Sequence, residues 1–326
     1  MSEVSIIGGG PAGSSAAIAA LQSSSKVRLI EKSRFPRHKV CGEFLSPEIA
    51  LLLERLGVWS EFLSSGPAHI RRLSLHFHKI EKNCRLPEPA YGLSRYRFDK
   101  LLLDEAIRLG ARVAAEIPEP ERPPLILAHG RRDSLPKGKR LFGFKAHFDG
   151  PLNDAVELYF FSGCYVGVSA VEGGSTNVCG LGPENFLKAR DFNIDDVVHS
   201  FPPLAERLRP LSRKFKWLSV GPLQYRNHFG SAIREGRYPA GDALSFVDPF
   251  TGSGLLTAVT TGSLAGTAAS RGTSTRDYLT ECRRCLQNPY RISSLLRAAL
   301  GSGWAEFLVP FVPGAWLVRF TRPQIE

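Results

Sequence analysis

The apolar residues of the chain follow three kinds of spacing. Short apolar runs at 4–7 and 27–30 are typical of parallel strands buried on both faces, and the alanine-rich stretch between them predicts a helix. Residues 73–77 alternate between apolar and polar side chains, as in a half-buried strand. Helical spacing returns over residues 96–110, which end in a glycine. The pattern predicts a parallel sheet with helices and a separate antiparallel sheet.

Further elements connect these two sheets. Ser46 and Pro47 suit the start of a helix, as N-cap and first-turn residue. Residues 116–124 carry four prolines and predict a connector, and residues 125–128 predict a strand that returns to the first sheet. Residues 142–181 read as successive strands with glycine turns, which form the main body of the antiparallel sheet.

A glycine-rich turn joins the first strand to the first helix. Gly8, Gly10 and Gly13 have the G-x-G-x-x-G spacing, in which glycines allow a tight bend and a close approach of a pyrophosphate to the backbone. Pro11 fits the first helical turn, and Ala12 follows it. The free N–H groups and the dipole of this helix favour an anionic phosphate. Strand, turn and helix together predict a dinucleotide site.

The second strand ends in a charged pair, Glu31 and Lys32. Glu31 follows Gly8 by twenty-three residues, where a carboxylate can accept the two hydroxyls of an adenosine ribose. A 2′-phosphate would be repelled there. We therefore expect the adenosine end of a dinucleotide at Glu31.

Composition and charge narrow the function classes. The chain has 326 residues, 43% of them apolar, and a net charge of +11, which favours an anionic ligand or a membrane surface. We find no nucleic-acid motif, no signal peptide and no spanning segment, so a cytoplasmic location is expected, with peripheral membrane contact through the basic C-terminal segment as an option. The other interpretation of that segment, residues 273–326, is a helical cap on the core. A monomer or a small homo-oligomer is expected.

The six cysteines are too scattered for a disulfide scaffold and are interpreted as reduced thiols. Cys282 and Cys285 form a C-x-x-C without a second ligand pair nearby, which is typical of two residues on one helix rather than of a zinc site. No metal site is predicted.

Three stretches together carry a family resemblance. They are the N-terminal glycine motif, FPRHKVCGEFLSPE at 35–48 and GDALSFVDPFTGSGLLTAVTTG at 241–262. In these motifs the chain resembles the para-hydroxybenzoate hydroxylase superfamily of FAD enzymes, and most of all its geranylgeranyl reductase-like branch, which neighbours the flavin-dependent halogenases. The resemblance implies a discontinuous Rossmann-type FAD-binding domain at 1–70, 94–140 and 233–272, and an antiparallel substrate domain at 71–93 and 141–232.

The resemblance also implies site residues. Asp242, after Gly241, would bind the ribityl chain of FAD, and the loop from Pro249 to Gly254 would lie beside the flavin ring. Cys41 would border the flavin and the substrate, either as a proton donor or as a small residue packed at a turn, and Arg95 would either approach FAD or only pair with Asp99. The implied cofactor-binding residues are Gly8, Gly10, Pro11, Ala12, Gly13, Glu31, Lys32, Cys41, Arg95, Gly241, Asp242, Pro249, Gly252, Ser253 and Gly254, with Tyr165 and Phe250 in the substrate pocket.

Two departures from the family leave the electron donor open. His129 stands before Gly130 where the family has an Asp-Gly pair linked to holding FAD and to NAD(P)H use, and the region 112–125 lacks the usual β-meander. The substrate-side signatures of the reductases and of the halogenases are also absent around Tyr165.

We therefore expect an FAD-dependent oxidoreductase acting on an apolar small molecule, prenyl-like or linked to a carrier or phosphate. A reductase or dehydrogenase is preferred to a monooxygenase, because the K-x-C-G-E segment belongs to the reductase-like branch. The alternative from another class is a flavin- or lipid-binding protein of the same fold without turnover.

Overall fold

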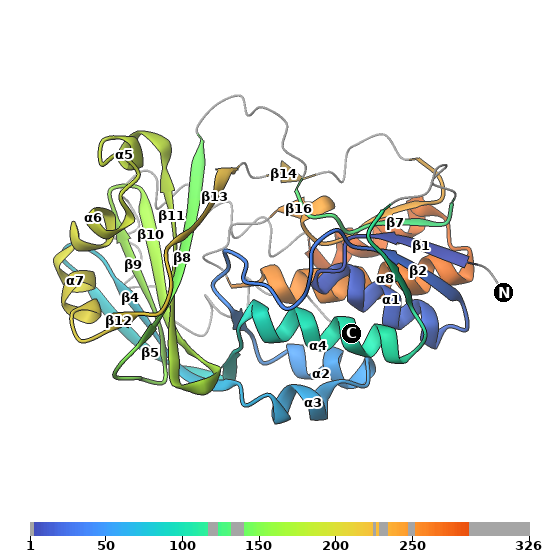
Figure 1. Cartoon of the computed structure of the whole chain (residues 1–326), viewed down its shortest axis with the longest axis horizontal. Helices are drawn as coiled ribbons and strands as arrows, with labels where there is room; N and C mark the ends of the chain where they lie inside the picture. Colours follow the sequence, from blue (N-terminus) through green and yellow to red (C-terminus); the bar gives the residue numbers. More distant parts are fainter. Residues whose placement is uncertain are drawn as a thin grey trace.

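The computed structural model describes residues 3–116, 123–131, 140–223, 226–227, 234–246 and 252–286. Two blocks lie side by side along the longest axis, a helix-rich block with a parallel sheet and a block built on an antiparallel sheet (Figure 1). The chain crosses between them several times, so residues far apart in sequence share each block.

The parallel sheet begins with the two strands expected from the N-terminal pattern. Its order is β15-β7-β1-β2-β6, and every neighbouring pair is parallel. The strand bounds are β1 Glu3–Ile7, β2 Lys26–Ile30, β6 Arg112–Ala114, β7 Leu125–Leu127 and β15 Arg237–Pro239. The return of residues 125–128 to this sheet, predicted from their apolar run, is confirmed.

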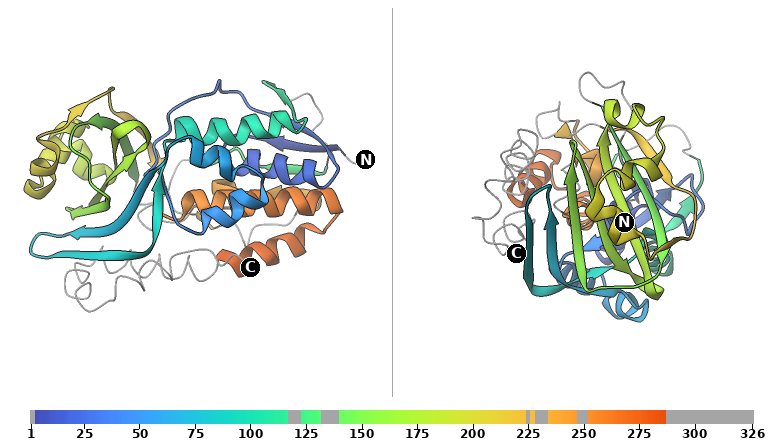
Figure 2. Two further views of the ribbon diagram at one scale, coloured as in Figure 1. Left: turned by 90° about the horizontal axis from the view of Figure 1, so that it is seen from below. Right: turned by 90° about the vertical axis from the view of Figure 1, so that its left-hand side faces the viewer.

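Helices α1, α4 and α8 pack below this sheet, and α2 and α3 lie beneath them, further from the strands (Figures 1 and 2). They are α1 Pro11–Gln22, α2 Ile49–Arg55, α3 Trp59–Ser64, α4 Arg95–Arg108 and α8 Gly254–Arg271, and residues 275–286 are also helical. The predicted helix over 96–110 is thus present as α4. The predicted N-cap at Ser46 is early by two residues: a turn follows the short strand β3 (Phe44–Leu45), which pairs with β5 (Glu81–Gly92), and α2 then begins with Glu48 at the N-cap.

Glycines allow α1 and α8 to pack closely. A Cβ placed on Gly262 would lie 2.1 Å from the carbonyl oxygen of Ala12, and one on Gly266 would lie 2.2 Å from that of Ala16. Both distances are far inside van der Waals contact, so only glycine fits at either position. The close packing holds the start of α8 beside the phosphate turn.

The second sheet has nine strands among the described residues. Its order is β12-β8-β11-β10-β9-β4-β5-β3, with β13 also paired to β8, and all pairs are antiparallel except β4 with β9. The bounds are β4 Ala68–His76, β5 Glu81–Gly92, β8 Leu141–Asp149, β9 Ala155–Phe161, β10 Cys164–Val171, β11 Ser175–Pro183, β12 Ser212–Arg213 and β13 Leu218–Leu223. A separate pair, β14 (Arg226–Asn227) and β16 (Ser245–Phe246), lies near the parallel sheet.

The two faces of the second sheet have different tasks. Helices α5 (Glu184–Lys188), α6 (Ile194–His199) and α7 (Pro202–Leu208) cover the outer face, over a core that includes Phe144, Phe148 and Val178. Alternate residues on the same strands point to the other face, toward the first block (Figure 1). On β8 and β11 these are mostly polar, namely Lys145, His147, Asn177 and Cys179.

Two other predictions concern the cysteines and the C-terminal segment. All six cysteines are free thiols, as expected, and Cys282 and Cys285 share the helix over 275–286. The apolar and basic stretch after residue 286 lies outside the described residues, and so do Pro249 and Phe250. Among the described helices, none is both long enough and apolar enough to cross a bilayer.

Candidate functional site

The phosphate turn has the geometry that the glycine spacing predicted. Gly8 adopts a φ of +101°, and a Cβ there would lie 2.3 Å from the carbonyl oxygen of Ala128 on the neighbouring β7 end. A Cβ on Gly13 would lie 1.7 Å from the carbonyl oxygen of Gly8. Helix α1 begins at Pro11, with Gly10 at the N-cap position and no side chain capping it. The first N–H groups of α1 therefore remain available to an anion.

Glu31 lies against this turn as an ionised acceptor. Its carboxylate accepts hydrogen bonds from the backbone N–H of Gly9 at 2.8 Å and of Ser33 at 2.7 Å, and Arg37 lies 3.6 Å away. Burial opposes ionisation, but these donors outweigh it and lower the pKa of Glu31. A carboxylate has more acceptor sites than these contacts fill, so Glu31 fits a ribose. Lys32, predicted beside it, is exposed, and no hydrogen bond or ion pair among the described residues links it to the turn.

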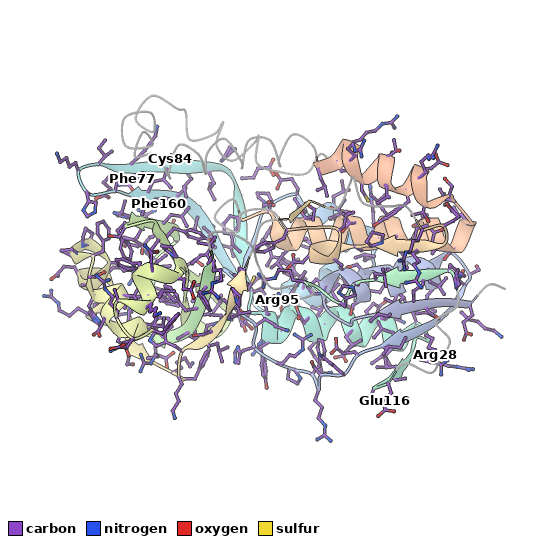
Figure 3. The ribbon with its side chains drawn as sticks, turned by 90° about the horizontal axis from the view of Figure 1, so that it is seen from above. Arg28, Phe77, Cys84, Arg95, Glu116 and Phe160 are labelled. Carbon is purple, nitrogen blue, oxygen red and sulfur yellow. The ribbon has the colours of Figure 1, made fainter. Side chains whose placement is uncertain are left out.

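Arg95 brings a guanidinium to the start of α1. It lies at the first position of α4, where the two blocks meet (Figure 3), and it pairs with Asp99 one turn later, Nε to Oδ1 at 2.5 Å and Nη2 to Oδ2 at 2.7 Å. A Cβ on Gly10 would lie 3.9 Å from Arg95 Nη2. Although burial disfavours a charge there, Asp99 raises the pKa of Arg95 above its usual value. Arg95 is thus both an ion-pair partner and a cation at the phosphate turn.

Arg37 is a second cation that sequence reasoning passed over. Its Nη1 lies 3.6 Å from Asp99 Oδ2, and its Nε and Nη1 are buried with no hydrogen-bond acceptor among the described residues. Buried guanidinium N–H groups without acceptors carry a desolvation penalty, which an anionic ligand would relieve. The residues present therefore fit the pyrophosphate of a dinucleotide.

Asp242 reaches the same region from the far end of the chain. It lies in a 3-10 turn, Gly241–Ala243, whose Gly241 has a φ of +59° and donates its N–H to Thr261 Oγ1 at 2.9 Å. A Cβ on Gly241 would lie 2.9 Å from the Cβ of Ala12, so this turn packs directly on the start of α1. The carboxylate is thereby held beside the phosphate turn, where an acceptor for ribityl hydroxyls was predicted.

A cation lies close to His129, which stands where the family has an acid. His129 Nδ1 lies 2.8 Å from the carbonyl oxygen of Gly130, and the next residue, Arg131, lies 3.7 Å from Asp242 Oδ2 with its guanidinium 4.4 Å from the centre of the Phe246 ring. Burial raises the pKa of Asp242, and Arg131, Arg95 and Lys39 act in the opposite direction. Sequence reasoning noted His129 but missed Arg131, whose only signal was its place after the glycine.

The start of α8 is open toward this region. Gly252 has a φ of +66°, Ser253 is buried at the N-cap position, and Gly254 is exposed with no atom within 4 Å of where a Cβ would be. Among the described residues, no atom therefore crowds the Gly254 side of this eighteen-residue helix start, and the helix dipole favours negative charge there. The described half of the predicted flavin loop thus offers a helix start that is suited to negative charge.

Cys41 lies in a loop that both blocks hold. Its thiol is half-buried, and its Sγ accepts a hydrogen bond from the N–H of Glu43 at 3.4 Å. From β11, the Nδ2 of Asn177 donates to the carbonyl oxygens of Cys41 at 3.1 Å and of Gly42 at 2.9 Å. Burial raises the pKa of Cys41, and the nearby Arg95 opposes this only in part. Cys41 therefore keeps its proton at neutral pH.

Glu43 is the centre of a charge cluster that sequence reasoning missed. Its side chain is fully buried, and its carboxylate bonds to the Lys145 ammonium, to His147 Nε2 at 2.6 Å and to the backbone N–H of Arg95 at 2.6 Å. Burial opposes its ionisation, but His147 and Lys145 prevail and lower the pKa of Glu43. The signal was the alternation of Lys145 and His147 with apolar residues in FGFKAHF, which places two polar side chains on one inner face.

One part of this cluster resembles a metal-ligand set. Ligand atoms of His38, Glu43 and His147 lie within 4.8 Å of one another. Lys145, however, places a positive charge on the same carboxylate, and His147 Nε2 is already at hydrogen-bond distance from it. A second cation would be repelled there, so we interpret the set as a hydrogen-bonded cluster. The ring of His38 packs against those of Tyr96 and Phe215, with centroids at 4.9 and 4.7 Å.

An apolar cluster lies on the same inner side of the antiparallel sheet. Leu181, Leu223 and Phe246 are buried in it, and Tyr165 is partly buried against them, together with Leu141 and Val220. Phe246 also packs on Arg131, which pairs with Asp242. The predicted pocket residue Tyr165 therefore faces an apolar environment that adjoins the cofactor-side charges.

Comparisons with known proteins agree with this geometry. Residues 1–117 match the FAD binding domain family. A menaquinone reductase of Mycolicibacterium smegmatis is 32% identical over 106 residues, which cover 32% of this chain and 25% of that protein. The chain thus spans about a quarter of the curated relatives that it matches.

Solved structures show the same fold over almost the whole chain. The flavin-dependent brominase Bmp2 superposes with a TM-score of 0.78 at 18% identity, covering 93% of this chain and 89% of that one. A geranylgeranyl bacteriochlorophyll reductase-like protein from Thermoplasma acidophilum superposes with a TM-score of 0.70 at 17% identity, covering 98% and 90%. The predicted fold class and FAD as cofactor are confirmed. Residues 1–117 thus match an FAD binding domain, and the chain has the fold of the flavin-dependent brominase and of the geranylgeranyl bacteriochlorophyll reductase-like protein.

Proposed function

We propose that the protein is an FAD-dependent reductase or dehydrogenase whose substrate is an apolar, unsaturated molecule. The observation that carries this proposal is the apolar cluster around Leu181, Leu223 and Phe246, which adjoins the charges on the cofactor side. An apolar substrate loses unfavourable contact with water in such surroundings, whereas a charged one would lose its hydration. Because two mycobacterial relatives are named menaquinone reductases, a lipid quinone is the first substrate to test.

Different residues of the chain would bind the cofactor, hold a proton and orient the substrate. The turn from Gly8 to Gly13, with Arg37 and Arg95, would hold the pyrophosphate, Glu31 the adenosine ribose and Asp242 the ribityl chain. When bound, FAD supplies the hydride. Cys41 holds a proton beside the domain boundary and can donate it to a reduced carbon or oxygen. The apolar cluster orients the substrate and excludes water.

A monooxygenase is the second candidate, because the brominase and other halogenases share the fold. Reduction and oxygenation differ in their requirement for oxygen. We would first record the visible spectrum of the purified protein, then add NADH or NADPH without oxygen, and then a short-chain quinone. Flavin bleaching followed by anaerobic reoxidation with a product that gains two hydrogens is expected for the reductase.

Other outcomes separate the alternatives. A product that gains an oxygen atom, formed only in air, would replace the reductase by the monooxygenase. A protein that remains colourless after FAD is added would contradict any flavin-dependent activity and favour a binding protein of the same fold.

A further inference from the structure

The inner face of the antiparallel sheet, opposite the face that α5, α6 and α7 cover, carries a stripe of polar side chains. We define this polar stripe as Lys145 and His147 on β8 and Asn177 and Cys179 on β11. In the strand register Lys145 lies opposite Cys179, and His147 lies opposite Asn177, so the four side chains form one compact patch. All of them point away from the helices that cover the outer face.

The polar stripe binds three consecutive residues of the other block. Asn177 donates to the carbonyl oxygens of Cys41 and Gly42, while Lys145 and His147 bond to the carboxylate of Glu43. Lys145 and Asn177 are almost completely buried, and His147 is 6% exposed. Ion pairs on a protein surface are far more exposed than these contacts. A buried charge that loses its partner strongly destabilises the protein. The hydrogen bonds of the stripe are therefore directed at this loop, while the ring of His147 also packs against those of His38 and Phe215.

The loop is also held in a conformation that it would not adopt alone. Glu43 has a φ of +54°, the left-handed region, which a glutamate rarely occupies without support. Its backbone carbonyl accepts from the N–H of Leu93 at 3.2 Å, and its carboxylate accepts from the N–H of Arg95. The same residue thus links the sheet, the loop of Cys41 and the start of α4.

We propose that Lys145, His147 and Asn177 are positioning residues, which hold the Cys41–Glu43 loop so that the Cys41 thiol stays beside Arg95 at the cofactor side of the domain boundary. This inference rests on the proposed function only for the reason why the Cys41 thiol is positioned. The contacts that hold the loop are independent of any substrate. It assigns to the antiparallel sheet a second task besides lining the pocket, namely setting the geometry of a loop in the FAD-binding block.

The test measures the protection of the Cys41 thiol in the FAD-loaded, full-length protein. Each variant is treated with iodoacetamide, and the alkylation rate of Cys41 is compared by peptide mass spectrometry with that of Cys84, a half-buried thiol on the β4–β5 hairpin (Figure 3). Asn177→Ala removes two hydrogen bonds without leaving a buried charge, and Lys145→Met removes the ammonium while keeping the apolar stem. We expect the ratio of Cys41 to Cys84 alkylation to rise by about tenfold or more in both, because the loop opens locally.

A matched control and a rescue separate positioning from general instability. Arg207→Met breaks the pair between Arg207 and Glu157, at 2.8 Å, in the same block but away from the loop, and the alkylation ratio should stay unchanged. The double variant Glu43→Gln/Lys145→Met has no unpaired charge, and the amide oxygen introduced by Glu43→Gln can still accept from Arg95 and His147. The ratio should therefore return to within a few-fold of the wild type. If Lys145→Met does not fold, Asn177→Ala, which leaves no buried charge unpaired, decides the matter.

The inference is overturned if Asn177→Ala leaves the alkylation ratio unchanged, or if Arg207→Met raises it as much as Lys145→Met does. The flavin spectrum, recorded on the same samples, separates this inference from the proposed function. A protein without FAD in which Cys41 is still protected by the polar stripe would contradict the proposed function alone. A flavoprotein whose Cys41 is indifferent to the stripe would contradict the positioning alone.

Discussion

Arg95 and Asp99 form a two-point ion pair along the first turn of α4, and this pair aims the guanidinium at Gly10. The carboxylate of Asp99 is fully buried, and Nε and Nη2 of Arg95 each contact one of its oxygens. The planar fork of arginine matches a carboxylate in this geometry, which a lysine cannot reproduce. The direction of the Arg95 side chain is therefore fixed before any ligand binds.

This relationship predicts a loss of FAD affinity in Arg95→Gln. A charge-assisted hydrogen bond to the pyrophosphate contributes about 1.5–3 kcal/mol, so the Kd for FAD should rise by roughly tenfold to a hundredfold. Fluorescence quenching of FAD in a titration measures it. The control is Arg108→Gln, at the exposed end of the same helix, where Arg108 pairs with Glu105 at 2.6 Å. Equal Kd values for both variants would show that Arg95 does not contact the cofactor.

Glu43 makes the stability of the protein depend on pH. Because its pKa in the folded protein is lowered from 4.5, its contribution to stability is fully present above that value and is lost as the pH falls through the lower folded pKa. Glu43→Gln should destabilise the protein by about 3–5 kcal/mol at neutral pH, since Lys145 keeps a buried charge without its partner. Urea unfolding measures the difference, which should narrow as the pH falls below 4.5, the ordinary value of the carboxyl, and through the lower folded pKa of Glu43.

A comparison variant for Glu43 is Glu184→Gln, because Glu184 pairs with Arg140 at a partly exposed site with a distance of 2.5 Å. Exposed pairs contribute about 0–1 kcal/mol, so this change should have little effect. A loss at Glu43 no larger than at Glu184 would mean that the buried cluster contributes nothing beyond an ordinary surface pair.

The contact between α1 and α8 predicts that Gly262→Ala destabilises the fold. The added methyl group would lie 2.1 Å from the Ala12 carbonyl oxygen, so the helices must separate, which costs about 1–3 kcal/mol. Thermal unfolding should show a lower Tm, and FAD affinity should fall with it because Ala12 belongs to the phosphate turn. Ser263→Ala, one residue further along, removes only a hydrogen bond to the carbonyl oxygen of Val259 and should leave the Tm nearly unchanged. An unchanged Tm in Gly262→Ala would contradict the close helix contact.

Arg131 should raise the reduction potential of bound FAD. A cation near the cofactor stabilises the extra negative charge of the reduced state, and the Arg131 guanidinium is held by Asp242 and by the Phe246 ring. Arg131→Gln should therefore lower the midpoint potential, by about 30 mV for each 1.4 kcal/mol of lost stabilisation. Equilibration with a reference dye measures it, and Arg131→Lys, which keeps the charge, should recover most of the shift. An unchanged potential in Arg131→Gln would place this cation away from the flavin.

Much of the fold and of the nucleotide site follows from local sequence rules. The bends at Gly8 and Gly13 and the acceptor at Glu31 depend on neighbours within about thirty residues, and spacing records them directly. The helix at 96–110 and the alternation at 73–77 likewise reflect one face of one element. These predictions needed no knowledge of what the elements touch.

The rest depends on contacts between distant residues, which spacing does not record. Glu43 meets Lys145 more than a hundred residues further along the chain, and only the register of β8 with β11 brings the partners of this loop together. Arg131 was similarly invisible, because its partner Asp242 lies in another segment. A buried charge is recognisable from sequence only when its partner is local, and the partners of Glu43 and Arg131 lie in distant segments of the chain.

The helix α4 has one more contact that reaches across the boundary. Glu172, in the turn between β10 and β11, accepts hydrogen bonds from the backbone N–H and the hydroxyl of Ser94, the N-cap residue of this helix. The first turn of α4, which carries Arg95, is thus anchored by the substrate-side block. For protein engineering this sets a limit: exchanging the antiparallel sheet for that of a relative also replaces the anchor of Arg95, whose guanidinium lies at the phosphate turn. A chimera should therefore keep Glu172, Lys145 and Asn177 together with the segment from Cys41 to Arg95 as one unit.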